Sequence, residues 1–105
     1  MALEEYAKKR FLIVDPLDSF CFSTKKTLKE LGLKLVDTAR SAQKVITGFE
    51  NINYDVVLCN YDLGKGKNGQ ELLEELRYRK LLKFTGLFFI VSAEVEKGKV
   101  MGTVE

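Results

Sequence analysis

Short apolar runs alternate with amphipathic segments along most of this chain. The apolar runs predict strands at residues 11–14, 34–37, 55–59 and 86–92. Between and after them, apolar residues recur at the three- and four-residue spacing of helices, at residues 18–31, 41–49, 69–79 and 93–104. Strands that alternate with helices over short links favour a parallel sheet covered on both faces. The pattern therefore predicts one α/β domain.

The helical spacing also predicts which side chains face the sheet. In the first three helices these are Phe20, Thr24, Leu28 and Leu31, then Val45, Ile46 and Phe49, then Leu72, Leu73 and Leu76. Asp18 or Ser19 is a candidate cap for the first helix, and Ser41 is one for the second.

Composition fits a single small domain at residues 1–105, with residues 1–9 as an N-terminal extension. The chain has 105 residues, of which 46% are hydrophobic and 30% are charged. Its net charge of +2, with basic residues interpreted as scattered over solvated faces, predicts no nucleic-acid partner. No apolar run is long enough for a membrane span, and the first ten residues lack a signal core. The expected location is cytoplasmic.

Two residue types narrow the chemistry further. The chain contains no histidine, which excludes histidine catalysis and histidine phosphotransfer on the chain itself. Cys21 and Cys59 lie in apolar or helix-like segments, so we expect buried thiols rather than a disulfide.

Two strand ends carry the candidate site. The segment FLIVDPLDSF ends its strand at Asp15, and YDVVLCNYDLGKGKNG ends its strand at Asn60 before a glycine-rich loop. Carboxyl ends of parallel strands meet at one edge of a sheet, where ligands bind. We therefore expect one carboxylate and one amide to lie close together there.

Three stretches in order, IVDPLDSF, VVLCNYDLGKGKNGQELLEEL and FFIVSAE, resemble the receiver domain of bacterial response regulators. The resemblance covers about residues 10–105. It implies a flavodoxin-like fold with three layers and a parallel sheet of strand order 2-1-3-4, in which the family's fifth strand and fifth helix have no counterpart.

In that family a histidine kinase phosphorylates an aspartate at the end of the third strand, and this position falls on Asn60. The acidic pair that helps to bind Mg²⁺ falls on Asp15 and Pro16, so one acid is replaced. The backbone carbonyl used for the metal belongs to Asp62, and the switch hydroxyl falls on Ser92. In the family, a lysine after the fifth strand contacts the phosphoryl group, and this lysine has no counterpart here.

These departures from the family pattern weaken both phosphotransfer and metal binding. An amide is a far poorer nucleophile than a carboxylate and forms no acyl phosphate. Mg²⁺ prefers hard, anionic oxygen ligands, and two negative charges are missing. We therefore expect weak Mg²⁺ binding at most and no phosphotransfer at Asn60. The sequence leaves open whether Asn60 is natural or engineered.

Each remaining candidate has two interpretations. Asp15 is either a cation ligand or a turn cap, and Asp18 either replaces the missing acid or caps a helix. Asp62 is either an alternative phosphoacceptor or a turn residue. Ser92 either contacts an anion or ends a strand. The loop with Gly64, Gly66 and Gly69 either cradles a phosphate or is simply flexible, since it lacks the P-loop ending.

The main hypothesis is a receiver-like signalling domain that binds partners and is not an enzyme, with no catalytic residues assigned. By resemblance, its partners are a histidine kinase or an output protein or domain, contacted through the fourth strand and residues 92–105. One alternative is a true phosphoacceptor domain whose aspartate was replaced by Asn60. Another is a flavodoxin-like mononucleotide binder. An apolar fourth strand at the sheet edge also predicts self-association.

Overall fold

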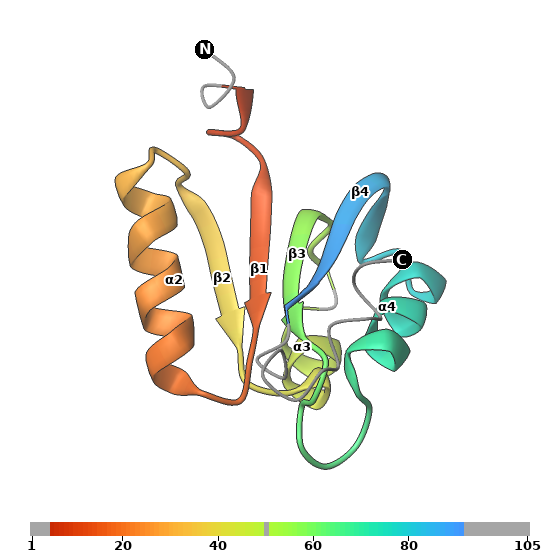
Figure 1. Ribbon diagram of the computed structural model, residues 1–105. Coiled ribbons are helices and arrows are strands. Elements are labelled where there is room, and N and C mark those ends of the chain that lie inside the picture. Colours follow the sequence, from red (N-terminus) through yellow and green to blue (C-terminus); the bar gives the residue numbers. More distant parts are fainter. Residues whose placement is uncertain (1–4, 50, 92–105) are drawn as a thin grey trace, which may run out of the picture.

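The computed structural model describes residues 5–49 and 51–91 and shows a four-stranded parallel sheet with helices on both faces (Figure 1). The strands are β1 (Arg10–Val14), β2 (Leu35–Ala39), β3 (Tyr54–Asn60) and β4 (Leu82–Val91). The helices are α2 (Asp18–Glu30), α3 (Ala42–Gly48) and α4 (Gly69–Tyr78). The strand order β2-β1-β3-β4 confirms the prediction. The helix predicted at residues 93–104 lies outside the described residues.

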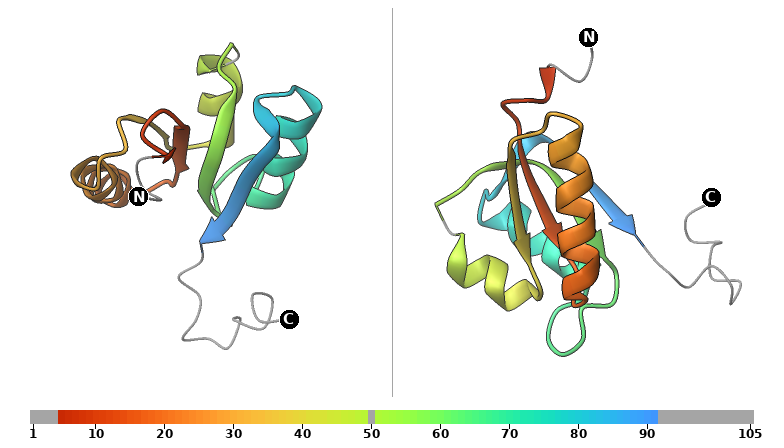
Figure 2. Two further views of the ribbon diagram at one scale, coloured as in Figure 1. Left: turned by 90° about the horizontal axis from the view of Figure 1, so that it is seen from above. Right: turned by 90° about the vertical axis from the view of Figure 1, so that its left-hand side faces the viewer.

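One face of the sheet is covered by α3 and α4 together and holds the larger apolar cluster (Figure 2). Leu12 and Val14 of β1 pack there with Leu72 and Leu76 of α4, all of them fully buried. Leu73 is only half-buried at the margin of this cluster. The inward face of α4 is therefore the predicted one.

Within residues 5–49 and 51–91, the opposite face is covered by α2 alone and holds a smaller cluster. Its buried members are Phe11, Ile13, Cys21, Leu33, Val36 and Val56. The prediction for α2 was partly wrong: Phe20 is 37% exposed and Leu31 is 49% exposed, whereas Cys21 is buried. The helix presents Cys21 and Leu28 to the sheet. Phe20, one position from Cys21, is turned by about 100° around the helix axis.

The helix starts differ in how they are capped. Leu17 is the N-cap of α2 and makes no side-chain capping bond, so neither Asp18 nor Ser19 is the cap that the sequence suggested. Asp18 instead lies in the first turn, where its negative charge interacts favourably with the helix dipole. Ser41 caps α3 as predicted, because its hydroxyl accepts a hydrogen bond from the N–H of Lys44 at 3.1 Å.

Strand β4 begins earlier than predicted and contains an irregularity. Tyr54 pairs with Leu82, but Val56, two residues on, pairs with Leu87. The extra β4 residues bulge around Asp55. At Gly86 a Cβ atom would lie 3.0 Å from the backbone oxygen of Asp55, so the close approach requires glycine. The sequence shows the apolar run at residues 86–92 but no signal for this bulge.

Polar contacts hold the bulge to the amino ends of its neighbours. The Asp55 carboxylate accepts the backbone N–H of Arg10 at 2.8 Å and forms an ion pair with Lys83 at 2.9 Å. Burial would raise the pKa of Asp55, but the Arg10 N–H and Lys83 outweigh it, and the net pKa is lowered. Asp55 thus ties β1, β3 and β4 together.

Two further features shape this end of the molecule. Tyr54 is fully buried, and its hydroxyl donates to Asp37 at 2.6 Å, linking β3 to β2. Lys80, just after α4, has a φ of 61°, a left-handed conformation that costs a non-glycine residue about 1 kcal/mol. Among the described residues, no helix is both long and apolar enough to cross a membrane.

Candidate functional site at the carboxyl edge of the sheet

Strand register brings Asp15 and Asn60 to adjacent strand ends. Val14 pairs with Cys59, so the next residue of each strand emerges at the same edge. Asp15 is only 6% exposed, and its backbone N–H donates to the carbonyl of Ala39 at 3.0 Å. Its carboxylate Oδ1 accepts the N–H of Leu17 at 2.8 Å, so this oxygen closes the turn before α2.

The Asn60 side chain is used within the site itself. Its amide Nδ2 donates to the backbone carbonyl of Asp62 at 3.0 Å. This carbonyl is the oxygen that the receiver resemblance assigns to the metal. The Asp62 carboxylate in turn accepts the N–H of Gly64 at 3.0 Å, which makes Asp62 a turn residue.

The glycine-rich loop is closed at its base. The N–H of Gly69 donates to the carbonyl of Tyr61 at 2.7 Å, so the two ends of the loop touch. A Cβ at Gly69 would lie 2.8 Å from the Asn60 carbonyl oxygen, which explains the need for glycine. Gly64 and Gly66 have positive φ angles of 82° and 88° in the loop itself. The loop glycines are therefore conformational requirements.

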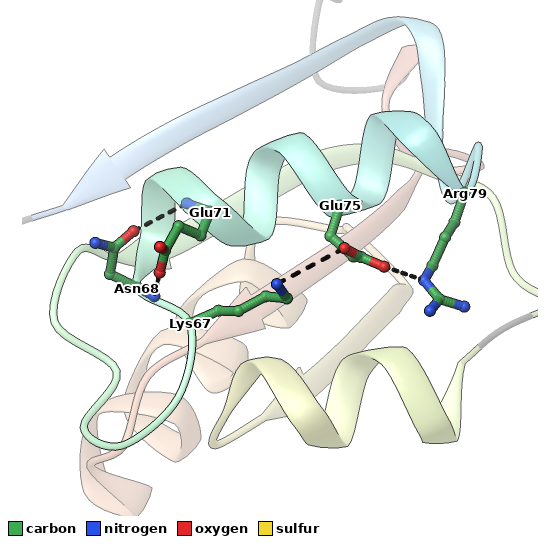
Figure 3. A network of polar contacts seen from close by, with 5 residues as sticks. All are labelled: Lys67, Asn68, Glu71, Glu75 and Arg79. Carbon is green, nitrogen blue, oxygen red and sulfur yellow. Dashed lines mark hydrogen bonds and ion pairs between the residues drawn. The ribbon is translucent and has the colours of Figure 1, made fainter.

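Polar contacts anchor the loop to α4 (Figure 3). Asn68 and Glu71 form a reciprocal capping box, with both hydrogen bonds at 2.9 Å. Lys67 points along the helix to Glu75, with 3.9 Å between Nζ and Oε1, and Arg79 contacts the same carboxylate. The Arg79 bond lowers the pKa of Glu75. The start of α4 is thus occupied by its own side chains, which disfavours a phosphate cradle.

Two thiols lie against the site backbone, a feature that the sequence analysis missed. Cys21 Sγ donates to the carbonyl of Asp15 at 3.4 Å, and Cys59 Sγ donates to the carbonyl of Asn60 at 3.2 Å. Both thiols are free and buried, as expected. Burial, and then the Asp15 charge, raise the pKa of Cys59 to about 12, and the same two causes raise the pKa of Cys21. Neither is an activated nucleophile.

The remaining candidates do not complete a cation site. Asp18 lines a shallow pocket with Arg40 and Lys44 beside the end of β2. Within residues 5–49 and 51–91, no three acidic or cysteine side chains group closely enough to hold a metal ion. Ser92 lies outside the described residues. The described carboxylates at this edge therefore lack the grouping of acids that Mg²⁺ prefers.

The carboxyl edge of this 2-1-3-4 parallel sheet carries Asp15 and Asn60 on adjacent strand ends, and solved structures of receiver domains share the fold. A CheY-like response regulator receiver domain from Methylobacillus flagellatus is 25% identical to this chain, with a TM-score of 0.70, covering 80% of this chain and 69% of that one. No protein-family model and no curated protein sequence matches the chain.

Two structures of the response regulator MaeR are also similar in fold. One is an aspartate-to-alanine mutant bound to sulfate, with 21% identity, a TM-score of 0.68, and coverage of 91% of this chain and 76% of that one. The other is bound to beryllium trifluoride, with 20% identity, a TM-score of 0.67, and coverage of 92% and 79%. The resemblance to receiver domains seen in the sequence is confirmed at the level of the fold.

Proposed function

We propose that this chain is a receiver-like signalling domain that acts through partner binding, without turnover and without phosphorylation at Asn60. The observation that carries the proposal is the bond from Asn60 Nδ2 to the Asp62 carbonyl. An amide N–H supplies at that oxygen the positive partner that a cation supplies in a phosphorylatable site. This hydrogen bond supports an edge whose conformation does not need a metal ion.

The remaining donors support the same proposal. Asp15 has one carboxylate oxygen committed to the Leu17 N–H, and Asp62 has one committed to Gly64. Pro16 offers no side-chain oxygen where the family has its second acid. We propose that the site has no functional Mg²⁺ affinity and that the conformation of this edge does not depend on a phosphodonor.

Intact-mass analysis after incubation with Mg²⁺ and acetyl phosphate tests this proposal. The unchanged chain should gain no phosphoryl group. Two variants should be incubated in parallel: Asn60→Asp, and Asn60→Asp combined with Pro16→Asp. They restore the missing carboxylates one at a time. Labelling of the unchanged chain would contradict the proposal, and Asp62→Asn and Asp15→Asn would then locate the acceptor.

The same variants address the phosphoacceptor alternative. If Asn60→Asp alone becomes labelled, replacement of a single amide restores the site, and the parent protein is best explained as a phosphorelay component. If neither variant is labelled, partner binding is the remaining function. A histidine kinase or an output domain is the partner class that the resemblance suggests, and a cytoplasmic location stays a prediction.

The mononucleotide alternative has little support at the Gly64–Gly69 loop. Asp62 takes the Gly64 N–H, and the capping box takes the N–H groups of Asn68 and Glu71. The acidic side chain of Glu71 in the first turn of α4 would also repel a phosphate. We do not propose nucleotide binding at this loop.

We also propose that the outer edge of β4 pairs with a second copy of the chain. Among the described residues, β3 is the only strand paired with β4. Leu87, Phe89 and Val91 lie on the α2 face of this strand and are 48%, 50% and 40% exposed. Free backbone groups beside half-exposed apolar side chains favour edge-to-edge pairing.

A further inference from the structure

The corner where α4 ends and β4 begins forms a pocket far from the carboxyl edge. It has a volume of about 400 Å³ and is lined by Asn53, Arg77, Lys80, Leu82, Lys83 and Phe84. Tyr54 and Leu82 pair at the start of their strands, so the pocket lies at the amino end of β3. None of the proposals for Asn60 uses these residues.

The pocket has a positive lining. It contains Arg77, Lys80 and Lys83 and no acidic side chain. Lys83 is paired with Asp55, but in the described part of the chain neither Arg77 nor Lys80 forms an ion pair. Among the described residues, two of these three cations are thus without an ion-pair partner, and the lining favours an anion.

An aromatic ring lies beside these cations and is almost fully exposed. Phe84 is 96% exposed, and Tyr78, next to Arg77 in the last turn of α4, is 85% exposed. A ring in this position contributes nothing to the core. It offers a flat surface on which a planar group can stack, as nucleic-acid bases do on aromatic side chains.

The backbone at Lys80 is an independent observation. Lys80 follows the C-cap Arg79 with a φ of 61°, at the helix position where glycine is most often found. A lysine costs more in this conformation than a glycine would. Strain of this kind at the lining of a pocket points to a role for the side chain rather than for the backbone.

We infer that this pocket binds a nucleoside phosphate, with Arg77 and Lys80 on the phosphate and Phe84 against the base. The unit can belong to a free nucleotide or to a single-stranded nucleic acid. An acidic peptide would satisfy the cations but would leave the ring of Phe84 unused. The inference departs from the expectation drawn from net charge, because the fold gathers cations that looked scattered in the sequence.

Fluorescence anisotropy with a labelled oligothymidylate of about ten nucleotides tests this inference on the full chain. Binding should be measured at about 50 mM and about 200 mM salt, since phosphate contacts weaken as salt rises. Thymidine monophosphate and an oligoglutamate peptide serve as competitors. We expect salt-sensitive binding that the oligoglutamate competes for poorly.

Matched variants make the result specific. Lys80→Gly and Phe84→Ala should each weaken binding by about fivefold or more. Lys26→Gln and Phe22→Ala remove an exposed cation and a 72% exposed ring from α2, and they should change binding less than twofold. Lys80→Gly relieves strain, so its melting temperature should be no lower than that of the unchanged chain, which separates lost binding from unfolding.

The competitor arms identify the source of the phosphate. Displacement by thymidine monophosphate supports a free nucleotide, and displacement by unlabelled oligothymidylate alone supports a single-stranded nucleic acid. Three results would overturn the inference: no binding at the lower salt, equal losses in the α2 controls, or an oligoglutamate that competes as well as the oligonucleotide while Phe84→Ala has no effect. None of these outcomes depends on phosphorylation at Asn60.

Discussion

The two faces of the sheet differ in how completely helices cover them. On the α3 and α4 face, Leu72 and Leu76 are fully buried against β1 and β3. On the α2 face, Cys21 is the only buried residue of the helix, and Phe89 of β4 is half exposed. One face therefore stabilises the domain, and the other leaves apolar surface available for contact.

Truncating one leucine on each face should give the largest difference in stability between the two faces. Leu72→Ala should lower the free energy of unfolding by about 3 kcal/mol, because it leaves a cavity in the packed cluster. Leu28→Ala, on the half-buried face of α2, should cost only about 1 kcal/mol. Urea denaturation of both variants measures the difference, and equal losses would show that the two faces are packed alike.

The sheet as a whole also depends on Asp55, which ties β1, β3 and β4 together and makes stability depend on pH. The folded pKa of Asp55 is lowered, so its contribution is present above the unfolded pKa of about 4 and is lost as pH falls through the folded value. Stability should therefore decline below about pH 4.

Asp55→Asn should remove part of that decline and destabilise the domain at neutral pH by about 1 kcal/mol. Thermal unfolding followed from pH 7 to acid measures both effects. Asp62→Asn is the matched control, because its carboxylate lies in an exposed loop. A decline that is unchanged in Asp55→Asn would assign the acid sensitivity to other carboxylates.

The smallest effect on stability should come from Phe89→Lys, within about 0.5 kcal/mol. A charge on the exposed face of β4 should nevertheless suppress pairing between copies. Sedimentation velocity over a range of concentrations measures the change, with Phe22→Lys on α2 as the control. A compact monomer at every concentration for the unchanged chain would contradict self-association through β4.

The sequence predicted the element order well because hydrophobic periodicity is a local signal, and the strand order followed from the receiver resemblance. Its failures come from tertiary contacts. The phase of α2 is set by the fit of Cys21 against the sheet, which Phe20 and its spacing did not indicate. The early start of β4 depends on pairing with Tyr54 and on the Asp55 contacts, which are distant in sequence.

At the candidate site, sequence reasoning brought Asp15 and Asn60 to one edge, and the register agrees. It gave the turn role of Asp62 as one of two interpretations. It had no means to find the Asn60 bond to the Asp62 carbonyl, since a hydrogen bond depends on side-chain orientation. The thiols against the site backbone were missed for the same reason.

The closed base of the loop after β3 has a consequence for engineering. Because the Gly69 N–H donates a hydrogen bond to the Tyr61 carbonyl, the two ends of the loop between them lie side by side. Extra residues at its tip would add only loop entropy, about 0.6 kcal/mol for each doubling of length. The tip near Lys65 is therefore a tolerant insertion site, where a reporter peptide can be added while β3 and α4 keep their positions.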